Sequence, residues 1–332
     1  TPPRRSGSRL NAGRLCVPFS AARAIIWTKR SNWFERMADG EFAAAHSRCP
    51  KPDPPDSTGV RCVSAWAGCH APTVTASAQP HALRPWYRKL RRRARYLAGR
   101  YPPVAFYRDF PVAIARSTEW LRTDPLVLRL SVFAAAHLSE NAGHGMDHAV
   151  KVARDAGALM IIELGMGGAS AEEIRGRVRV VHCAGLLHDI KRTERDHAIR
   201  GARFVRALLE NAPLTRDEIE DIVQAIRNHE AFVRPVPVNT IEGRRVASCL
   251  YDADKFRWGP DNFTDTIWDM VTAAGIPPAT FLAAVPRGME KLKAIKTTFR
   301  TRIGRRYGPA FIDRGLAIGA ALFDISDSED RP

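Results

Sequence analysis

The chain has 332 residues, of which 45% are hydrophobic, and a formal net charge of +16. Such a length and apolar content suffice for one large domain or two small ones with a buried core, which excludes a chain that is disordered throughout. Residues 1–100 hold 19 of the Lys and Arg against 5 of the Asp and Glu, which leaves 32 against 30 for residues 101–332. The basic excess therefore lies in residues 1–100 and is no guide to the substrate of residues 101–332.

Residues 1–82 have the composition of a segment that does not pack. They are rich in Pro, Ser, Ala and Arg, lack sustained hydrophobic periodicity, and contain the breaker run KPDPPDSTG. Such segments bury too little apolar surface to offset the lost conformational entropy. We expect a disordered or non-native N-terminal extension, since a start at Thr1 is typical of a fragment or of an extended reading of a shorter protein.

The strongest basic run is RPWYRKLRRRARYLAGR, from Arg84 to Arg100, in which aromatic residues stand among the cations. A nucleic acid or an anionic membrane surface would suit such a run. Because no folded RNA-binding motif accompanies it, the simpler interpretation is a solvated helix. We predict a basic helical linker over 83–123 and no nucleic-acid module.

The compartment is inferred from what the chain lacks. No stretch has the roughly 18 uninterrupted apolar residues that a membrane-spanning helix needs, so no transmembrane segment is expected. The six cysteines include no C-x-x-C pair, which argues against a zinc finger and a regular disulfide framework. A reducing cytoplasm fits this usage best.

From Asp124 onward the chain is a succession of amphipathic segments with short breakers. A segment near Asp147 places His148 on its apolar face, and a segment over 196–211 does the same for His197.

A third segment begins with the capping box TRDE at Thr215 and ends in an inward His229. No alternating pattern is long enough to need a sheet, so we predict an all-α helical bundle over 124–325.

The chemistry centres on His188 and Asp189 in the apolar string VHCAGLLHDI. Imidazole and carboxylate bind divalent metals, and a buried ionisable pair is costly unless something coordinates it. His148 and a carboxylate from Asp252 or Asp254 would complete three or four ligands and leave open positions for water and substrate. An ion in such a site suits hydrolysis of a phosphoester or phosphoanhydride.

These residues resemble the H…HD…D signature of the HD-domain superfamily of metal-dependent phosphohydrolases, in particular its small stand-alone members. The match covers about residues 130–270, and the strings HGMDHAVKV, AGLLHDIKR, IRNHE and YDADKF are also similar. The resemblance implies an all-α fold of core helices around a divalent ion. The metal ligands that it implies are His148, His188, Asp189 and Asp254, with Asp252 as the alternative to Asp254.

Some members of the superfamily have two further histidines that bind a second metal or contact phosphate, and His197 and His229 fit those positions. Cations next to the ligands suit the neutralisation of a substrate phosphate. On this basis the expected catalytic residues are Asp189, Lys191 and Arg192, and the expected substrate-binding residue is Lys255.

The predicted function is a metal-dependent phosphohydrolase that acts on a nucleotide or another small phosphorylated molecule, with one or two ions of Mn, Mg, Co, Fe or Zn. Two alternatives stay open. Six inward ligands would also suit an HD-type di-iron oxygenase. A metal cage without turnover would make the protein a metal- or nucleotide-binding sensor module. No oligomeric state can be inferred from the sequence.

Overall fold

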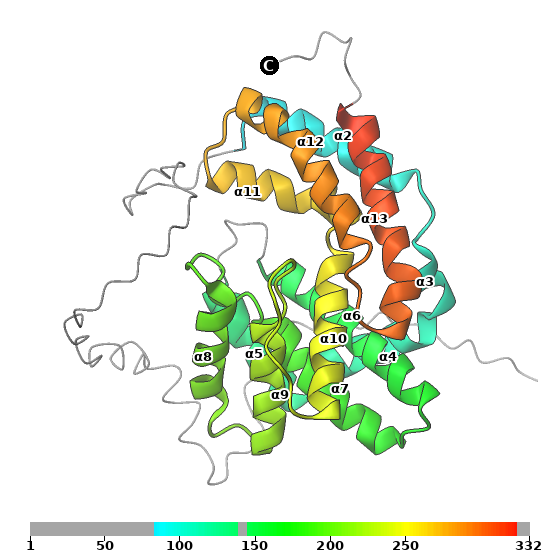
Figure 1. Ribbon diagram of the computed structural model, residues 1–332, viewed down its shortest axis with the longest axis vertical. Coiled ribbons are helices and arrows are strands. Elements are labelled where there is room, and N and C mark those ends of the chain that lie inside the picture. Colours follow the sequence, from blue (N-terminus) through cyan, green and yellow to red (C-terminus); the bar gives the residue numbers. More distant parts are fainter. Residues whose placement is uncertain (1–82, 139–144, 324–332) are drawn as a thin grey trace, which may run out of the picture. The chain divides into compact units, whose positions relative to one another are not determined.

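The computed structural model describes residues 83–138 and 145–323, and every regular element in these two ranges is a helix (Figure 1). The all-α class is confirmed. The extension predicted over 1–82 lies outside the described residues. In chain order the helices are α2 (Pro85–Gly99), α3 (Ala105–Asp109), α4 (Pro111–Thr123), α5 (Pro125–His137), α6 (Met146–Met166), α7 (Ala171–Leu187), α8 (His197–Leu209), α9 (Arg216–Arg227), α10 (Ile241–Phe256), the π-helical turn η3 (Asn262–Thr266), α11 (Ile267–Ala273), α12 (Pro278–Ile295) and α13 (Arg302–Phe323).

Four helices form the frame of the candidate site, because α6 and α9 both pack on α7 and on α10 (Figure 1). Helix α9 begins where the sequence predicts: the Thr215 hydroxyl accepts from the Glu218 amide at 3.2 Å, and the Glu218 carboxylate accepts from the Thr215 amide at 2.8 Å. Ile222 and Ile226 on its inner face are fully buried. Burial of each such side chain stabilises the fold by about 1.5–3 kcal/mol.

The contact between α6 and α7 depends on a glycine. A Cβ at Gly185 on α7 would lie 2.5 Å from the Ala153 Cα on α6, closer than any side chain allows. The Gly185 carbonyl also faces His188 Nδ1 at 2.8 Å. The close approach fixes the helix spacing, and the Gly185 carbonyl orients the His188 imidazole.

The segment over 83–123, for which we predict a basic helical linker, contains α2, α3 and α4. Helix α2 packs on η3, α11 and α13, and its Tyr87 is buried with the ring centroid 6.0 Å from that of Trp268 and 5.5 Å from that of Phe281. Arg91 on the same helix forms ion pairs with carboxylates of η3 and α11. The basic run forms an amphipathic helix, and the C-terminal helices cover its apolar side.

Two cysteines lie among the described residues. Cys183 and Cys249 are buried, and burial raises the pKa of both thiols. None of the helices between residues 83 and 323 has both the length and the apolar character that crossing a membrane requires.

Gly185→Ala should lower the free energy of unfolding by about 1–3 kcal/mol, because the new methyl group would force α6 and α7 apart. Gly176→Ala on the same helix is the matched control: nothing lies within 4 Å of the added Cβ, so it should raise stability by about 0.5–1 kcal/mol. Urea unfolding measures both changes. A Gly185→Ala protein as stable as the wild type would contradict the close approach of the two helices.

Candidate metal centre

Three helices bring the candidate ligands to one point. His148 lies in the first turn of α6, Asp254 lies in the last turn of α10, and His188 and Asp189 directly follow α7. All four side chains are buried, with no more than 8% of their surface exposed. Residues that are far apart in the sequence thus share one small volume of the core.

The donor atoms of this cluster lie at similar distances from one another. His148 Nε2 is 3.2 Å from His188 Nε2 and 3.3 Å from Asp254 Oδ1. Asp189 Oδ2 is 3.3 Å from His188 Nε2 and 3.9 Å from His148 Nε2. Two ligands at about 2.1 Å from one ion are about 3.0 Å apart at a right angle and about 3.4 Å apart at a tetrahedral angle. The separations of 3.2–3.3 Å have the size of the edges of such a coordination shell, and the separation of 3.9 Å corresponds to a wider angle at the ion.

Backbone carbonyls set the orientation of two imidazoles. His188 Nδ1 faces the Gly185 carbonyl at 2.8 Å, and His229 Nδ1 faces the Ile226 carbonyl at 2.6 Å. A carbonyl can only accept, so Nδ1 carries the proton and the Nε2 lone pair points into the cluster. This is the tautomer that metal-binding histidines adopt.

The electrostatics of the cluster favour ionised carboxylates. Burial raises the pKa of Asp189 and of Asp254, but nearby positive groups outweigh this effect and hold both pKa values well below the usual range. For Asp189 the largest opposing contribution comes from His188, and for Asp254 it comes from Lys255. Burial lowers the pKa of His229 and keeps this imidazole neutral. Burial lowers the pKa of His188, but the carboxylates of Asp189 and Asp254 outweigh this effect and raise it, so without a metal ion this imidazole favours its protonated form. A divalent ion binds ionised carboxylates and neutral imidazoles, so it would displace that proton.

The other oxygen of Asp189 faces a second pair of histidines. Asp189 Oδ1 lies 3.4 Å from His197 Nε2 and 3.4 Å from His229 Nε2. Among the described residues no group gives this buried oxygen a well-aligned hydrogen bond. An acceptor left unsatisfied in the core is costly, and a cation on this side would compensate it. His188, Asp189 and His229 accordingly form a second buried group whose donor atoms lie within 4.8 Å of one another.

Asp252, the alternative ligand, lies outside the cluster. Its two carboxylate oxygens accept from the backbone amides of Arg300 and Thr301 at 2.8 Å each. Burial raises its pKa to about 6. The carboxylate thus holds the turn before α13, whereas Asp254 faces His148.

The three predicted cations differ in where they point. Arg192 Nη1 lies 3.0 Å from His197 Nε2 and 3.8 Å from Asp189 Oδ1, so this guanidinium reaches the cluster. Lys191 does not: its ammonium pairs with Glu194 at 3.0 Å and lies over the Phe204 ring.

Lys255 is buried against Asp254 Oδ2 and between the rings of Tyr251 and Trp258. Its side chain is 3% exposed and its charge faces Asp254; its role in substrate binding stays a prediction.

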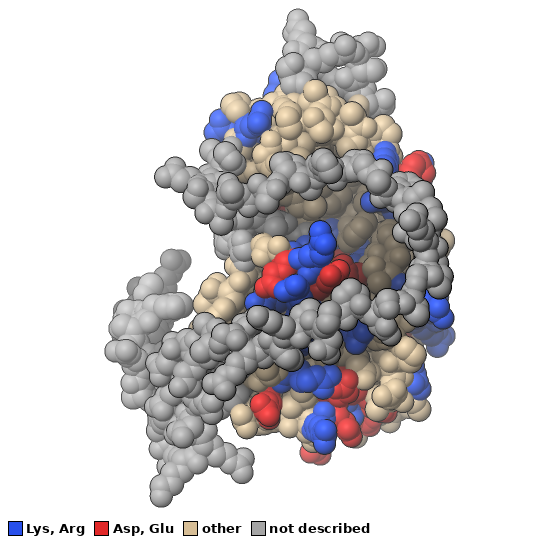
Figure 2. All heavy atoms as spheres, turned by 60° about the vertical axis from the view of Figure 1, so that its left-hand side comes forward, with Lys and Arg blue, Asp and Glu red and all other residues tan. Residues whose placement is uncertain are grey.

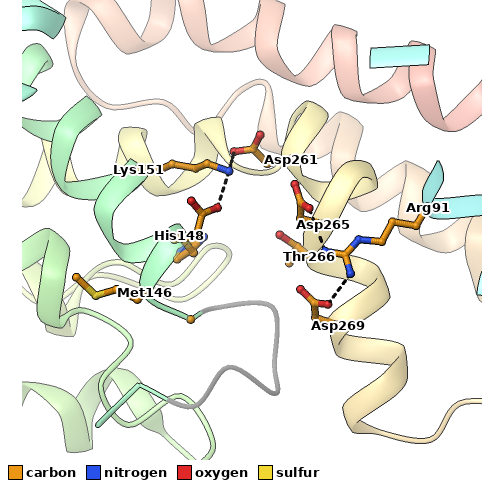
Figure 3. A pocket seen from close by; sticks show the side chains of 10 residues that line it. Arg91, Met146, His148, Lys151, Asp261, Asp265, Thr266 and Asp269 are labelled. Carbon is orange, nitrogen blue, oxygen red and sulfur yellow. Dashed lines mark hydrogen bonds and ion pairs between the residues drawn. The ribbon is translucent and has the colours of Figure 1, made fainter. Parts of the chain in front are cut away.

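A pocket of about 160 Å³ opens beside the cluster, and His148 is part of its lining (Figure 3). Lys151, one turn further along α6, places its ammonium in the same pocket, 2.7 Å from Asp147 Oδ2 and 3.9 Å from Asp261 Oδ2. We did not predict Lys151, although its spacing of three residues from His148 is the signal that places both on one helix face.

Two buried groups near these residues serve the fold. Asp155 accepts from Tyr107 and Arg257 at 2.6 Å each and ties α6 to α3 and α10. His182 on α7 lies six residues before His188, and its Nε2 is 2.9 Å from the Ser117 hydroxyl, away from the cluster.

Comparison with known proteins identifies the domain in which the cluster lies. Residues 145–257 match the family model described as HD domain. The match begins just before α6 and ends just after α10, so it contains all the predicted ligands. No curated protein and no solved structure matches the chain.

His182 should make stability depend on pH. Burial lowers its pKa to about 3, so between about pH 6.5 and pH 3 the unfolded chain binds a proton that the folded protein does not. The stability that the neutral His182 contributes is fully present above pH 6.5 and is lost as the pH falls. Between pH 7 and pH 5 the loss due to His182 is about 2 kcal/mol.

Urea unfolding at several pH values measures this dependence. In His182→Gln the decrease between pH 7 and pH 5 should be smaller by that amount, and in His137→Gln, at an exposed site on α5, it should be unchanged. Identical pH profiles for His182→Gln and the wild type would contradict a neutral, buried His182.

Proposed function

Since residues 145–257 place the chain in the HD-domain superfamily of metal-dependent phosphohydrolases, we propose that it hydrolyses a phosphoester or phosphoanhydride of a small phosphorylated molecule. The observation that carries the proposal is the convergence of His148, His188, Asp189 and Asp254 at 3.2–3.9 Å in the core. Buried ionisable groups at such spacing are costly without a compensating ion.

The four residues would hold a divalent metal ion. The donor set of two imidazoles and two carboxylates suits Mn, Fe, Co, Zn or Mg and leaves positions for water and substrate. When bound, such an ion lowers the pKa of water and neutralises charge on a phosphoryl oxygen.

The protein side chains orient the water and bind the phosphate. Asp189, ionised at neutral pH, accepts a hydrogen bond from the attacking water and orients its oxygen toward phosphorus. That oxygen forms the new bond to phosphorus, the bond from phosphorus to the leaving oxygen breaks, and a water proton ends on the leaving group. Arg192 at one end of the cluster and Lys151 at the other bind phosphoryl oxygens, as cations do in phosphoryl transfer.

His197 and His229 would contribute to a second metal position. The two oxygens of Asp189 face two different sets of imidazoles, so this carboxylate would contribute a ligand to either position. His197 Nε2 also faces Arg192, so this nitrogen serves either the ion or the guanidinium. Two ions would stabilise the attacking and the leaving oxygen together.

The experiment is elemental analysis combined with phosphate release from nucleotides and simple phosphoesters in the presence of Mn²⁺, Mg²⁺, Co²⁺ or Fe²⁺. The wild type should bind one or two ions and release phosphate. The His188→Ala, Asp189→Ala double variant should lose both, with activity down by at least about 100-fold. His137→Ala, a histidine exposed on α5, is the control and should keep both.

Other outcomes separate the competing functions. Equal metal content in the double variant and the wild type would refute the site. Bound iron with oxygen consumption and no phosphate release would support the di-iron oxygenase. Metal and nucleotide binding without turnover would support the sensor module.

A further inference from the structure

The pocket beside the cluster is built by two parts of the chain. Its inner side, with His148 and Lys151, belongs to the HD domain. Its outer wall comes from residues beyond the family match: Arg91 of α2 and the carboxylates Asp265 and Asp269 of η3 and α11 (Figure 3). The part of a substrate that lies away from the metal would therefore meet groups that are not part of the HD domain.

Arg91 holds this outer wall in place. Its Nη2 donates to Asp265 Oδ1 at 3.1 Å and its Nη1 to Asp269 Oδ1 at 3.2 Å, while Nε donates to the Thr264 carbonyl. A guanidinium that spans two carboxylates fixes both in direction. Because a carboxylate has about four acceptor sites, each can still accept from a ligand.

The charges of the wall are balanced. Asp265 pairs with Arg91 and Arg95, and Asp269 pairs with Arg91. Lys151 in turn lies between two carboxylates. On the face in Figure 2, too, basic and acidic side chains lie next to one another. A wall of neutralised carboxylates favours neutral donors, such as hydroxyl groups, over a further cation.

The exposure of the two carboxylates and the size of the pocket restrict the class of ligand further. The side chains of Asp265 and Asp269 are 31% and 34% exposed, so a ligand can reach them. The volume of about 160 Å³ is below the roughly 300–1,000 Å³ of pockets for drug-sized ligands. It suits a compact body rather than a sugar with an attached base.

From these features we propose that the pocket binds a hydroxyl-rich leaving group, so that the substrate is a compact phosphate ester of a polyol or sugar. Its hydroxyls donate to Asp265 and Asp269 while its phosphate meets Lys151 and the metal centre. This inference rests on the proposed phosphohydrolase function and narrows its substrate.

Two matched esters test the proposal with the Mn²⁺-loaded full chain. Ribitol 5-phosphate and pentyl phosphate have the same carbon chain and the same phosphate, but only the first carries free hydroxyls. The wild type should hydrolyse ribitol 5-phosphate with a kcat/KM at least about tenfold higher. Asp269→Ala should reduce this preference about tenfold, whereas Asp313→Ala, in an exposed ion pair with Lys296, should retain it.

Calorimetric titration of both esters into the metal-free full chain gives the same comparison without turnover, and Asp269→Asn replaces Asp269→Ala if that variant does not fold. Equal rates and equal affinities for the two esters would overturn the proposal, as would an unchanged preference in the variants. If p-nitrophenyl phosphate is hydrolysed while ribitol 5-phosphate is not, the substrate class is wrong and the phosphohydrolase stands. If no phosphoester is hydrolysed, the proposed function fails, and calorimetry still decides whether the pocket selects hydroxyls.

Discussion

The carboxylates of Asp189 and Asp254, buried among histidines in a helical core, are the constraint on which the rest of the structure depends. Moving an ion from water into a protein interior costs several kcal/mol even after relaxation. Neighbouring side chains reduce this cost. His188 lies against Asp189, and His148 and Lys255 lie against Asp254. The arrangement has the spacing and the tautomers of a metal centre, and we infer that the compensation is completed by a divalent ion.

The helices around this centre have two different tasks. Helices α6, α7, α9 and α10 position the candidate ligands. The close approach at Gly185 fixes the distance between α6 and α7. Helix α2, η3 and α11 lie outside the family match and supply the wall of the pocket through Arg91 and its carboxylate partners. If the proposed function holds, the HD domain carries the chemistry and the residues outside it select the substrate.

Features encoded by local periodicity or by a spaced motif could be predicted from the sequence. Helical periodicity indicated the fold class, the capping box indicated the start of α9, and the motif order indicated candidate ligands that meet in the core. Local pattern could not separate Asp252 from Asp254, because the difference lies in Arg300 and Thr301, amides from a distant turn. Local pattern also could not show that Arg91 of α2 pairs with the distant Asp265, or that Lys255 is buried against its neighbour Asp254.

Anomalous diffraction from crystals grown with Mn²⁺ tests the metal centre most directly, since it locates the ion without relying on turnover. We predict an anomalous peak within bonding distance of the Nε2 atoms of His148 and His188 and of carboxylate oxygens of Asp189 and Asp254. A second peak near His229 would identify a dinuclear centre. A peak at Asp252 alone, or no peak among these four residues at saturating Mn²⁺, would contradict a metal centre at this position.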